Sequence, residues 1–211
     1  MVKDGIYYAA GLSAGGAAVW WLAGRWFSLP LWVVAAFCLY FFRDPEREIP
    51  EGPVAVSPAD GKVVAVQPEN GANRISIFLN IFDVHVNRAP IAGRICQVEY
   101  HKGQFLVASR EEASSRNERN TITLQGDGTS VVFKQIAGLI ARRIVCRVRQ
   151  GDRVGKGERI GLIKFGSRVD VLFGPEWEIL VRPGMRVAAG ASVIARRLDM
   201  AHGPAPEAYG A

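Results

Sequence analysis

The pair Gly166-Ser167 has the most distinctive chemical potential in this sequence. The serine hydroxyl can attack the carbonyl of the peptide bond just before it. Glycine lacks a Cβ, so it tolerates the strained backbone that such an attack requires. The pair lies in the segment Phe165 to Asp170, which continues as an alternating Arg-Val-Asp-Val run. A Gly-Ser pair is also a common turn or bulge, so its interpretation depends on the other groups that the chain offers.

A serine that attacks its own chain needs a base, and histidine is the usual one near neutral pH. The chain contains three histidines. His202 lies in a C-terminal tail rich in Ala, Gly and Pro, and His101 lies in a polar turn. The run from Asp83 to Asn87 contains His85, and strand alternation predicts that these three side chains share one face. His85 is therefore the candidate base.

Asp60 is the candidate third member of the site. It belongs to an Asp-Gly pair between two apolar runs, which alone predicts a hairpin turn. An aspartate can also fix the tautomer of a histidine and stabilise its protonated form. We therefore expect Ser167, His85 and Asp60 to be the catalytic residues.

The composition limits the classes of partner. A formal net charge of +6 indicates an anionic partner such as nucleic acid or acidic lipid. No basic run with interleaved aromatic residues occurs, which disfavours nucleic acid. Cys38, Cys96 and Cys146 are widely spaced and odd in number, so we expect apolar fillers in a reducing compartment. We expect no metal site.

Residues 1–47 predict a membrane-attached helical hairpin. Residues 5–24 carry no charge and are numerous enough to cross a bilayer as a helix, and residues 26–42 form a second uncharged run. Tryptophans and tyrosines lie near the ends of both runs, as is typical of a membrane interface. Whether the second run spans the bilayer or only dips into it stays open. A cleaved signal peptide is disfavoured because the second run follows at once.

The basic residues around these runs predict the orientation of the arm. Lys3 precedes the hairpin, Arg43 and Arg47 follow it, and Arg25 lies in its turn. This excess places both ends of the hairpin on the cytoplasmic side. The expected location is the cytoplasmic membrane, with the remainder of the chain facing the cytoplasm.

Residues 48–211 predict a β-rich catalytic domain. Short runs rich in β-branched residues alternate with turn residues, and no long 3.6-residue periodicity occurs, which favours a β-barrel or sandwich. The expected strands are Val54 to Val56, Lys62 to Val66, Ile75 to Leu79, Ile95 to Glu99, Thr121 to Leu124, Val131 to Gln135 and Ile144 to Val148.

An internal repeat refines this expectation. The pattern from Val148 to Gly157 recurs 33 residues later, from Val181 to Gly190. Two such pseudosymmetric units are similar to the flattened β-sandwich of biotinyl and lipoyl carrier domains. The segment from Phe165 to Asp170 lies between the copies, where we expect a tight approach of strands to expose it. The polar loop from Ser109 to Asn120 is either a solvated surface segment or part of the site.

Several short motifs together resemble the short bacterial form of the phosphatidylserine decarboxylase proenzyme family, over essentially the whole chain. They are Phe42-Arg43-Asp44-Pro45, Pro58-Ala59-Asp60-Gly61, Asp83-Val84-His85-Val86-Asn87-Arg88-Ala89-Pro90, Arg116-Asn117-Glu118-Arg119-Asn120, Gln135-Ile136-Ala137-Gly138 and Phe165-Gly166-Ser167-Arg168-Val169-Asp170. Each motif is weak alone. Their order behind an apolar arm is specific.

The resemblance implies that Ser167 becomes a covalent pyruvoyl cofactor. Cleavage between Gly166 and Ser167 would leave a β chain of residues 1–166 and an α chain of residues 167–211, which stay associated. Asp60 and His85 would assist this cleavage. Longer family members have a second histidine where this chain has Arg88, so His85 is expected to serve both maturation and turnover.

The resemblance also implies the activity. The pyruvoyl group would form a Schiff base with phosphatidylserine and withdraw electrons as carbon dioxide leaves, giving phosphatidylethanolamine for phospholipid biosynthesis. The expected partner is phosphatidylserine in the membrane. Whether the protein forms a homo-oligomer stays open.

Two other functions remain. A lipoyl- or biotin-like carrier or membrane adaptor is suggested by the repeat and by Lys164, and it predicts an uncut chain. A soluble pyruvoyl decarboxylase of free amino acids is disfavoured by the apolar arm.

Overall fold

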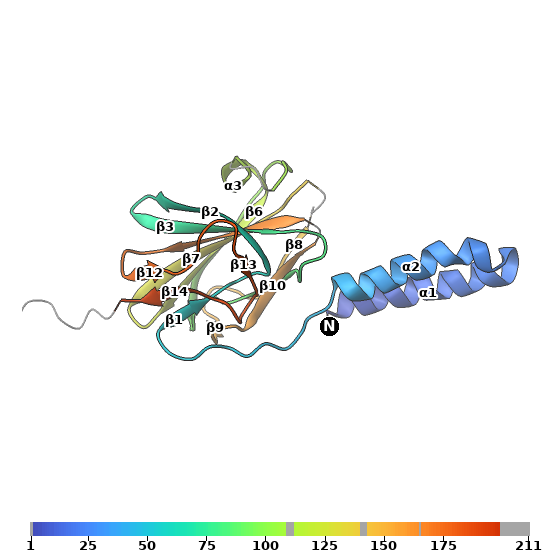
Figure 1. Ribbon diagram of the computed structural model, residues 1–211, viewed down its shortest axis with the longest axis horizontal. Helices are drawn as coiled ribbons and strands as arrows, with labels where there is room; N and C mark the ends of the chain where they lie inside the picture. Colours follow the sequence, from blue (N-terminus) through green and yellow to red (C-terminus); the bar gives the residue numbers. More distant parts are fainter. Residues whose placement is uncertain (1, 109–111, 140–142, 165, 199–211) are drawn as a thin grey trace, which may run out of the picture.

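The computed structural model describes residues 2–108, 112–139, 143–164 and 166–198, which form a helical arm and a β domain (Figure 1). Phe165, His202 and the predicted tail therefore lie outside the described residues. The helices are α1 (Lys3–Ala23), α2 (Arg25–Phe41) and the short α3 (Ala113–Arg116). The strands are β1 (Val54–Val56), β2 (Gly61–Glu69), β3 (Ala72–Leu79), β4 (Val86–Arg88), β5 (Gly93–His101), β6 (Arg119–Gly126), β7 (Thr129–Ile136), β8 (Arg143–Cys146), β9 (Arg153–Val154), β10 (Arg159–Lys164), β11 (Ser167–Phe173), β12 (Trp177–Ile179), β13 (Arg186–Val187) and β14 (Val193–Arg197).

The arm is an antiparallel pair of helices joined at Gly24, whose φ of +96° suits glycine. Small residues of α1 face α2, because its buried positions are Gly5, Ala9 and Gly16. A Cβ on Gly16 would lie 3.1 Å from the ring of Trp32 in α2, which is tighter than an ordinary contact. The close approach of the helices therefore depends on small residues in α1.

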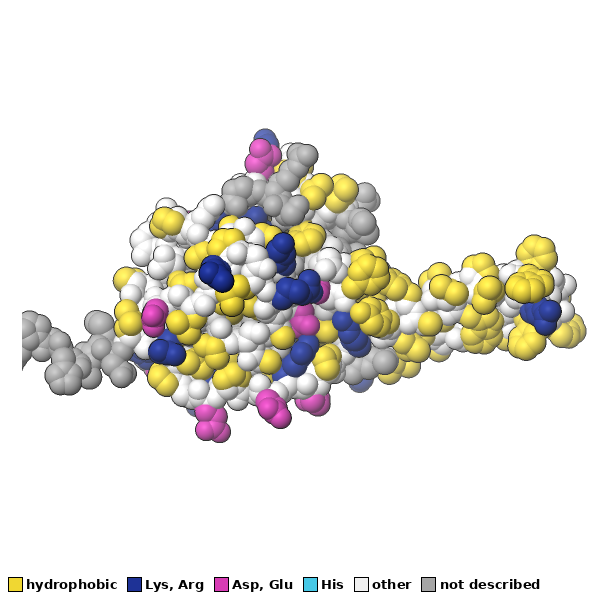
Figure 2. Space-filling view, viewed as in Figure 1, with side chains coloured by type: hydrophobic (Ala, Val, Ile, Leu, Met, Phe, Trp, Pro, Cys, Tyr) yellow, Lys and Arg dark blue, Asp and Glu magenta, His cyan; other side chains and the backbone are white. Residues whose placement is uncertain are grey.

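The arm exposes most of its large apolar side chains (Figure 2). These exposed residues include Tyr7, Tyr8, Trp20, Trp21, Leu22, Trp26, Phe27, Leu29, Val33 and Val34. Two helices, α1 and α2, form in the region of the predicted hairpin, and the membrane attachment of this arm stays a prediction. Within the part of the chain that the structure describes, no helix has the length and apolar character needed to cross a bilayer.

The β domain confirms the mainly β prediction. An eight-stranded antiparallel sheet has the order β13-β2-β3-β11-β7-β6-β5-β9, and two three-stranded sheets have the orders β1-β14-β12 and β4-β10-β8. Strands occupy the seven predicted runs, with shifts of a few residues at their ends. One apolar cluster, with Ile75, Ile77, Phe133 and Val171 among its fully buried members, fills the interior. This core fixes the strands that carry the candidate site.

The run from Ser167 to Phe173 forms β11, which lies between β3 and β7 inside the large sheet. The predicted exposure of this run is wrong. Val169, Val171 and Phe173 belong to the apolar core, while Arg168 and Asp170 lie on the other face and are also buried. The alternation correctly indicates a strand, but the apolar core covers one face of it and α3 contacts Asp170 on the other.

The internal repeat is visible in the backbone. Gly151 and Gly184 have φ values of +96° and +98°, and the later glycines of the two copies, Gly157 and Gly190, have +77° and +79°. The first copy forms β9 and pairs with β5, whereas the second forms β13 and pairs with β2. The two copies therefore hold opposite ends of the eight-stranded sheet.

Candidate active site

The Gly166-Ser167 peptide bond lies where the chain enters β11. Ser167 pairs with Leu79 of β3, and its side chain is fully buried. Within the part of the chain that the structure describes, its Oγ has no hydrogen-bond partner. Gly166 has a φ of +51°, in the left-handed region that glycine adopts readily. An unpaired buried hydroxyl is costly to keep, so this one calls for a chemical explanation.

The carbonyl of Gly166 is held against another glycine, Gly138, which follows β7. A Cβ on Gly138 would collide with the carbonyl oxygen of Gly166. A cavity of about 190 Å³ also opens beside Gly166, lined by Phe78, Val107, Ala108 and Leu139. The bond predicted to break therefore borders a small apolar cavity.

His85 lies just before β4, rather than inside the strand that the alternation predicts. Its Nδ1 donates a hydrogen bond to the carbonyl oxygen of Asp83 at 2.9 Å. That bond leaves the lone pair on Nε2, which is buried and meets no hydrogen-bond partner in residues 2–108, 112–139, 143–164 and 166–198. The neutral imidazole in this tautomer is suited to accept a proton at Nε2.

Two backbone pairings bring Ser167 and His85 into one region. The N–H of Ile163, near the end of β10, donates to the carbonyl of His85 at 3.3 Å, and the chain reaches Ser167 four residues later. On the other side, Ser167 pairs with Leu79, and the turn after β3 leads to His85. The two candidates are therefore on adjacent, short connections.

Burial controls the charge of His85. Its side chain is 2% exposed, and removal from water lowers the pKa of the imidazole to about 4, against the opposing effect of the Asp83 carbonyl and carboxylate. The nearby charge of Arg43 acts in the same direction as burial. His85 is therefore neutral at pH 7 and available as a base.

Asp60 lies near this region with different partners from those expected. Its carboxylate accepts a hydrogen bond from Nη2 of Arg47 at 2.9 Å and one from the backbone N–H of Ala189 at 2.7 Å. Burial raises the pKa of the Asp60 carboxyl, while these two partners oppose the increase. For the described atoms, the tautomer of His85 is set by the carbonyl of Asp83 instead of the carboxylate of Asp60.

Asp83 is a residue that the sequence analysis did not select as catalytic. Its carboxylate is paired with Arg186 and accepts a hydrogen bond from the N–H of Asn80 at 2.9 Å. Its carbonyl orients His85. The sequence places Asp83 two residues before His85. That spacing predicts a shared strand face, but it does not predict the hydrogen bond from His85 to the Asp83 carbonyl.

A chain of buried amides connects several of the sequence motifs. Nε2 of Gln135 donates to Oδ1 of Asn87 at 2.8 Å, and Nδ2 of Asn120 donates to Oε1 of Gln135 at 3.1 Å. Nδ2 of Asn117 donates to the carbonyl of Ala137 at 2.8 Å, next to Gly138. The described end of the predicted polar loop is thus packed toward the candidate site.

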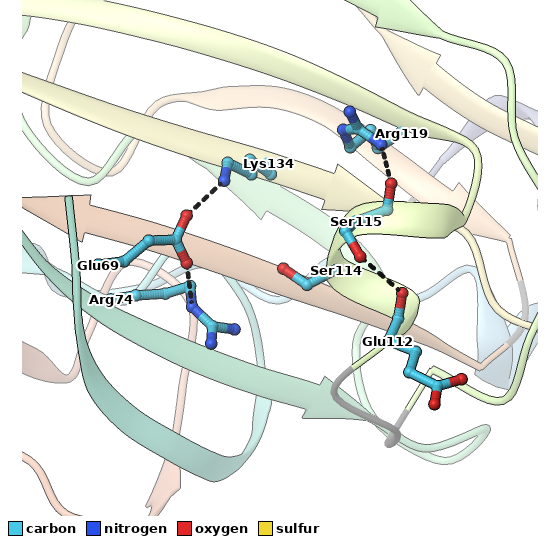
Figure 3. Close-up of a pocket in the computed structure, with 7 residues that line it drawn as sticks. All are labelled: Glu69, Arg74, Glu112, Ser114, Ser115, Arg119 and Lys134. Atoms are coloured by element: carbon cyan, nitrogen blue, oxygen red, sulfur yellow. Dashed lines mark hydrogen bonds and ion pairs between the residues drawn. The ribbon is translucent and has the colours of Figure 1, made fainter.

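A charged pocket of about 430 Å³ lies on the face of β11 that points away from the apolar core (Figure 3). Arg74, Glu69 and Lys134 form ion pairs along one wall, and α3 supplies Ser114 and Ser115 on the other. Beneath it, Asp170 accepts hydrogen bonds from Arg168 at 2.6 Å and from Ser114. This network anchors α3 to the strand that begins at Ser167.

The protein is mainly β with a helical arm, and its candidate site combines a buried Gly-Ser junction with a neutral histidine on an adjacent connection. A sequence model of phosphatidylserine decarboxylase matches residues 34–195. The chain is 72% identical over 199 residues to the phosphatidylserine decarboxylase proenzyme of Solibacter usitatus, covering 94% of this chain and 98% of that protein. It is 44% identical to the proenzyme of the same name from Magnetococcus marinus, covering 93% and 94% of the two chains. The chain belongs to the phosphatidylserine decarboxylase family.

Proposed function

We infer that this chain is a proenzyme that cleaves itself and then decarboxylates phosphatidylserine to phosphatidylethanolamine. The family supports the activity. The observation that carries the maturation is that Ser167 Oγ and His85 Nε2 are both buried and have no hydrogen-bond partner among the described residues. These are the nucleophile and the base that self-cleavage requires.

In the proposed cleavage, Oγ of Ser167 attacks the carbonyl carbon of Gly166 while Nε2 of His85 accepts the hydroxyl proton. The peptide C–N bond breaks as the nitrogen of Ser167 takes up a proton, which leaves an ester. Loss of the α proton expels the Gly166 carboxylate and gives dehydroalanine. Water then releases ammonia and leaves a pyruvoyl group at the start of the 167–211 chain. Asp60 supports this reaction through its negative charge.

The residues of the site fit such a group. Ser167 supplies its atoms, and the cavity beside Gly166 is lined by apolar side chains. Once formed, the pyruvoyl group supplies a carbonyl that binds an amine and accepts electrons during decarboxylation. Nε2 of His85 is then the group placed to return a proton to the substrate.

The arm attaches the protein to the cytoplasmic membrane in this proposal, with the β domain facing the cytoplasm. Its support is the exposed apolar and aromatic surface of α1 and α2 and the basic residues that flank them. The chains of residues 1–166 and 167–211 stay together because β11 pairs with β3 and β7 across the cut.

The carrier function is less well supported. Carrier domains need an accessible lysine, whereas Lys164 is 8% exposed and forms an ion pair with Asp4 at 2.8 Å. The likeness of the repeat to biotinyl and lipoyl domains is kept here as a proposal about architecture, supported by the matched glycine conformations of the two copies.

The activity is tested with vesicles that contain phosphatidylserine. Mature protein should release carbon dioxide and form phosphatidylethanolamine, while Ser167→Ala should do neither because alanine has no hydroxyl to convert. Free serine should be a poor substrate. Equal turnover of free serine would instead support the soluble amino-acid decarboxylase.

A further inference from the structure

The end of the arm nearest the β domain contacts His85, the proposed proton acceptor of the maturation reaction. Phe41, the last residue of α2, has its ring centroid 4.3 Å from that of His85, with 36° between the ring planes. Phe41 is 1% exposed. It therefore covers the imidazole on one side and contributes to its separation from water.

This contact belongs to a second apolar cluster that joins the arm to the β domain. Its buried members are Val2, Phe41 and Phe42 from the arm and Val84, Val86 and Leu162 from the β domain. Arg43, just after α2, donates through Nη2 to the carbonyl of Phe82 at 2.6 Å. The end of α2 is thus fixed to the turn that leads into His85.

A second contact joins the arm to the strand that leads into the cleavage site. Lys164 ends β10, two residues before Gly166. Its Nζ lies 2.8 Å from the carboxylate of Asp4 and 3.3 Å from the hydroxyl of Tyr8. The ring centroid of Phe42 lies 5.6 Å from the same Nζ. Two residues of α1 and the residue that follows α2 therefore contact Lys164.

The charged groups around His85 are few. Asp83 lies in its own segment with its carboxylate paired to Arg186, and Arg43 approaches from the end of α2. The more distant Asp60 acts on Asp83. Burial has the largest effect on the protonation of His85, and the ring of Phe41 is one of the groups that bury it.

We propose that the base of the arm is part of the maturation site, with Phe41 covering His85 and the Asp4–Lys164 contact fixing the strand that leads into Gly166-Ser167. Phe41, Asp4 and Lys164 are positioning residues. The arm then has a role in chemistry that is separate from membrane attachment. This inference rests on the proposed self-cleavage.

The first test follows cleavage of newly synthesised proenzyme in detergent micelles, where membrane attachment does not limit the reaction. The loss of full-length chain is measured between pH 4 and pH 8. Wild-type cleavage should fall only near pH 4, because neutral His85 persists down to that pH. Phe41→Ala admits water to His85 and should raise the pH of half-maximal cleavage by about 1 to 2 units.

Phe37→Ala is the matched control. Phe37 lies one turn earlier in α2 and packs against Phe41, with ring centroids 6.0 Å apart. This variant removes the same ring while Phe41 still covers His85, so its midpoint should match wild type. If Phe41→Ala does not fold, the smaller truncation Phe41→Val replaces it and should give an intermediate midpoint. An unchanged midpoint in the folded Phe41 variant overturns the inference.

The second test reverses the ion pair. Lys164→Glu should slow cleavage about tenfold, because a small displacement of the reacting groups has a large effect on rate. Combining it with Asp4→Lys should restore most of the rate. A reversed pair that cleaves no faster than Lys164→Glu contradicts the role of this contact. Absence of cleavage in the wild-type chain would instead contradict the proposed maturation itself.

Discussion

At the scale of single residues, the site combines a histidine with a lowered pKa and a serine hydroxyl without a described hydrogen bond. His85 donates through Nδ1 to a backbone carbonyl, so its tautomer does not depend on a carboxylate. Burial keeps it neutral at physiological pH, since its pKa is lowered to about 4. Ser167 Oγ is buried and has no partner among the residues that the structure describes. The proposed self-cleavage begins with a neutral imidazole, which can accept a proton, and a protonated serine hydroxyl, which can donate one.

Gly138 gives a prediction at this scale. An alanine at this position would push its Cβ into the carbonyl oxygen of Gly166, so the bond to be cleaved must shift. We expect Gly138→Ala to fold and to slow self-cleavage about 100-fold, the size of effect that a misplacement near 1 Å can produce. Pulse-chase labelling measures the rate, and circular dichroism checks the fold.

The control for Gly138→Ala is Gly155→Ala. A Cβ there would lie 3.7 Å from Oε2 of Glu158, an ordinary contact. It should leave cleavage unchanged. A folded Gly138→Ala chain that matures at the wild-type rate would show that this close approach does not position the carbonyl.

At the scale of elements, β11 connects the site to a buried charge network. Arg168 and Asp170 are fully buried and form an ion pair at 2.6 Å, and Arg74 lies 3.4 Å from the same carboxylate. The Ser114 hydroxyl joins α3 to Asp170. The strand that begins at Ser167 is thus fixed by charge on one face and by apolar packing on the other.

We therefore expect Asp170→Asn to destabilise the fold by about 3 kcal/mol, because it leaves buried guanidinium charge uncompensated. Urea unfolding in a Ser167→Ala background measures this on one uncut chain. The comparison variant, Glu69→Gln, removes a carboxylate that is partly exposed and should cost at most about 1 kcal/mol. Equal losses for the two variants would contradict the importance of burial.

Local pattern predicts much of the β architecture and little of the site's surroundings. Alternation and turn residues are properties of neighbouring residues, so they locate runs such as Ile75 to Leu79 correctly. Burial of β11 depends on β3, β7 and α3, which its own residues do not encode, and this is why its predicted exposure is wrong.

The contacts that complete the site are long-range. Gly138 meets Gly166, and Phe41 meets His85, across distant parts of the chain. Sequence chemistry selects Ser167 and His85 because nucleophile and base are recognisable residue types. A covering phenylalanine and a spacing glycine are common residues, and only the fold reveals what they touch.

At the scale of the whole molecule, the arm extends from one end of the β domain and presents apolar side chains along its length (Figures 1 and 2). Trp21 and Trp26, near its tip, are 86% and 72% exposed. A surface of this kind favours contact with lipid. The substrate of the proposed reaction is itself a membrane lipid, and we propose that the arm brings the site to it.

We expect the wild-type protein to fractionate with the cytoplasmic membrane. The double variant Trp21→Ser, Trp26→Ser should bind vesicles about tenfold more weakly, because it exchanges two large apolar surfaces for polar ones. Tyr100→Ser, which removes an exposed aromatic residue of β5, should bind normally.

Protease added outside spheroplasts should leave the β domain intact, and digestion there would contradict the proposed orientation.

Intact-mass analysis of the purified active protein tests the central claim most directly. Self-cleavage predicts two associated chains, residues 1–166 and residues 167–211, the second with a pyruvoyl group and no free amine at its N-terminus. Ser167→Ala should remain one inactive chain. An active wild-type protein that is a single chain of 211 residues, or a second chain that begins with a free serine, would contradict the account.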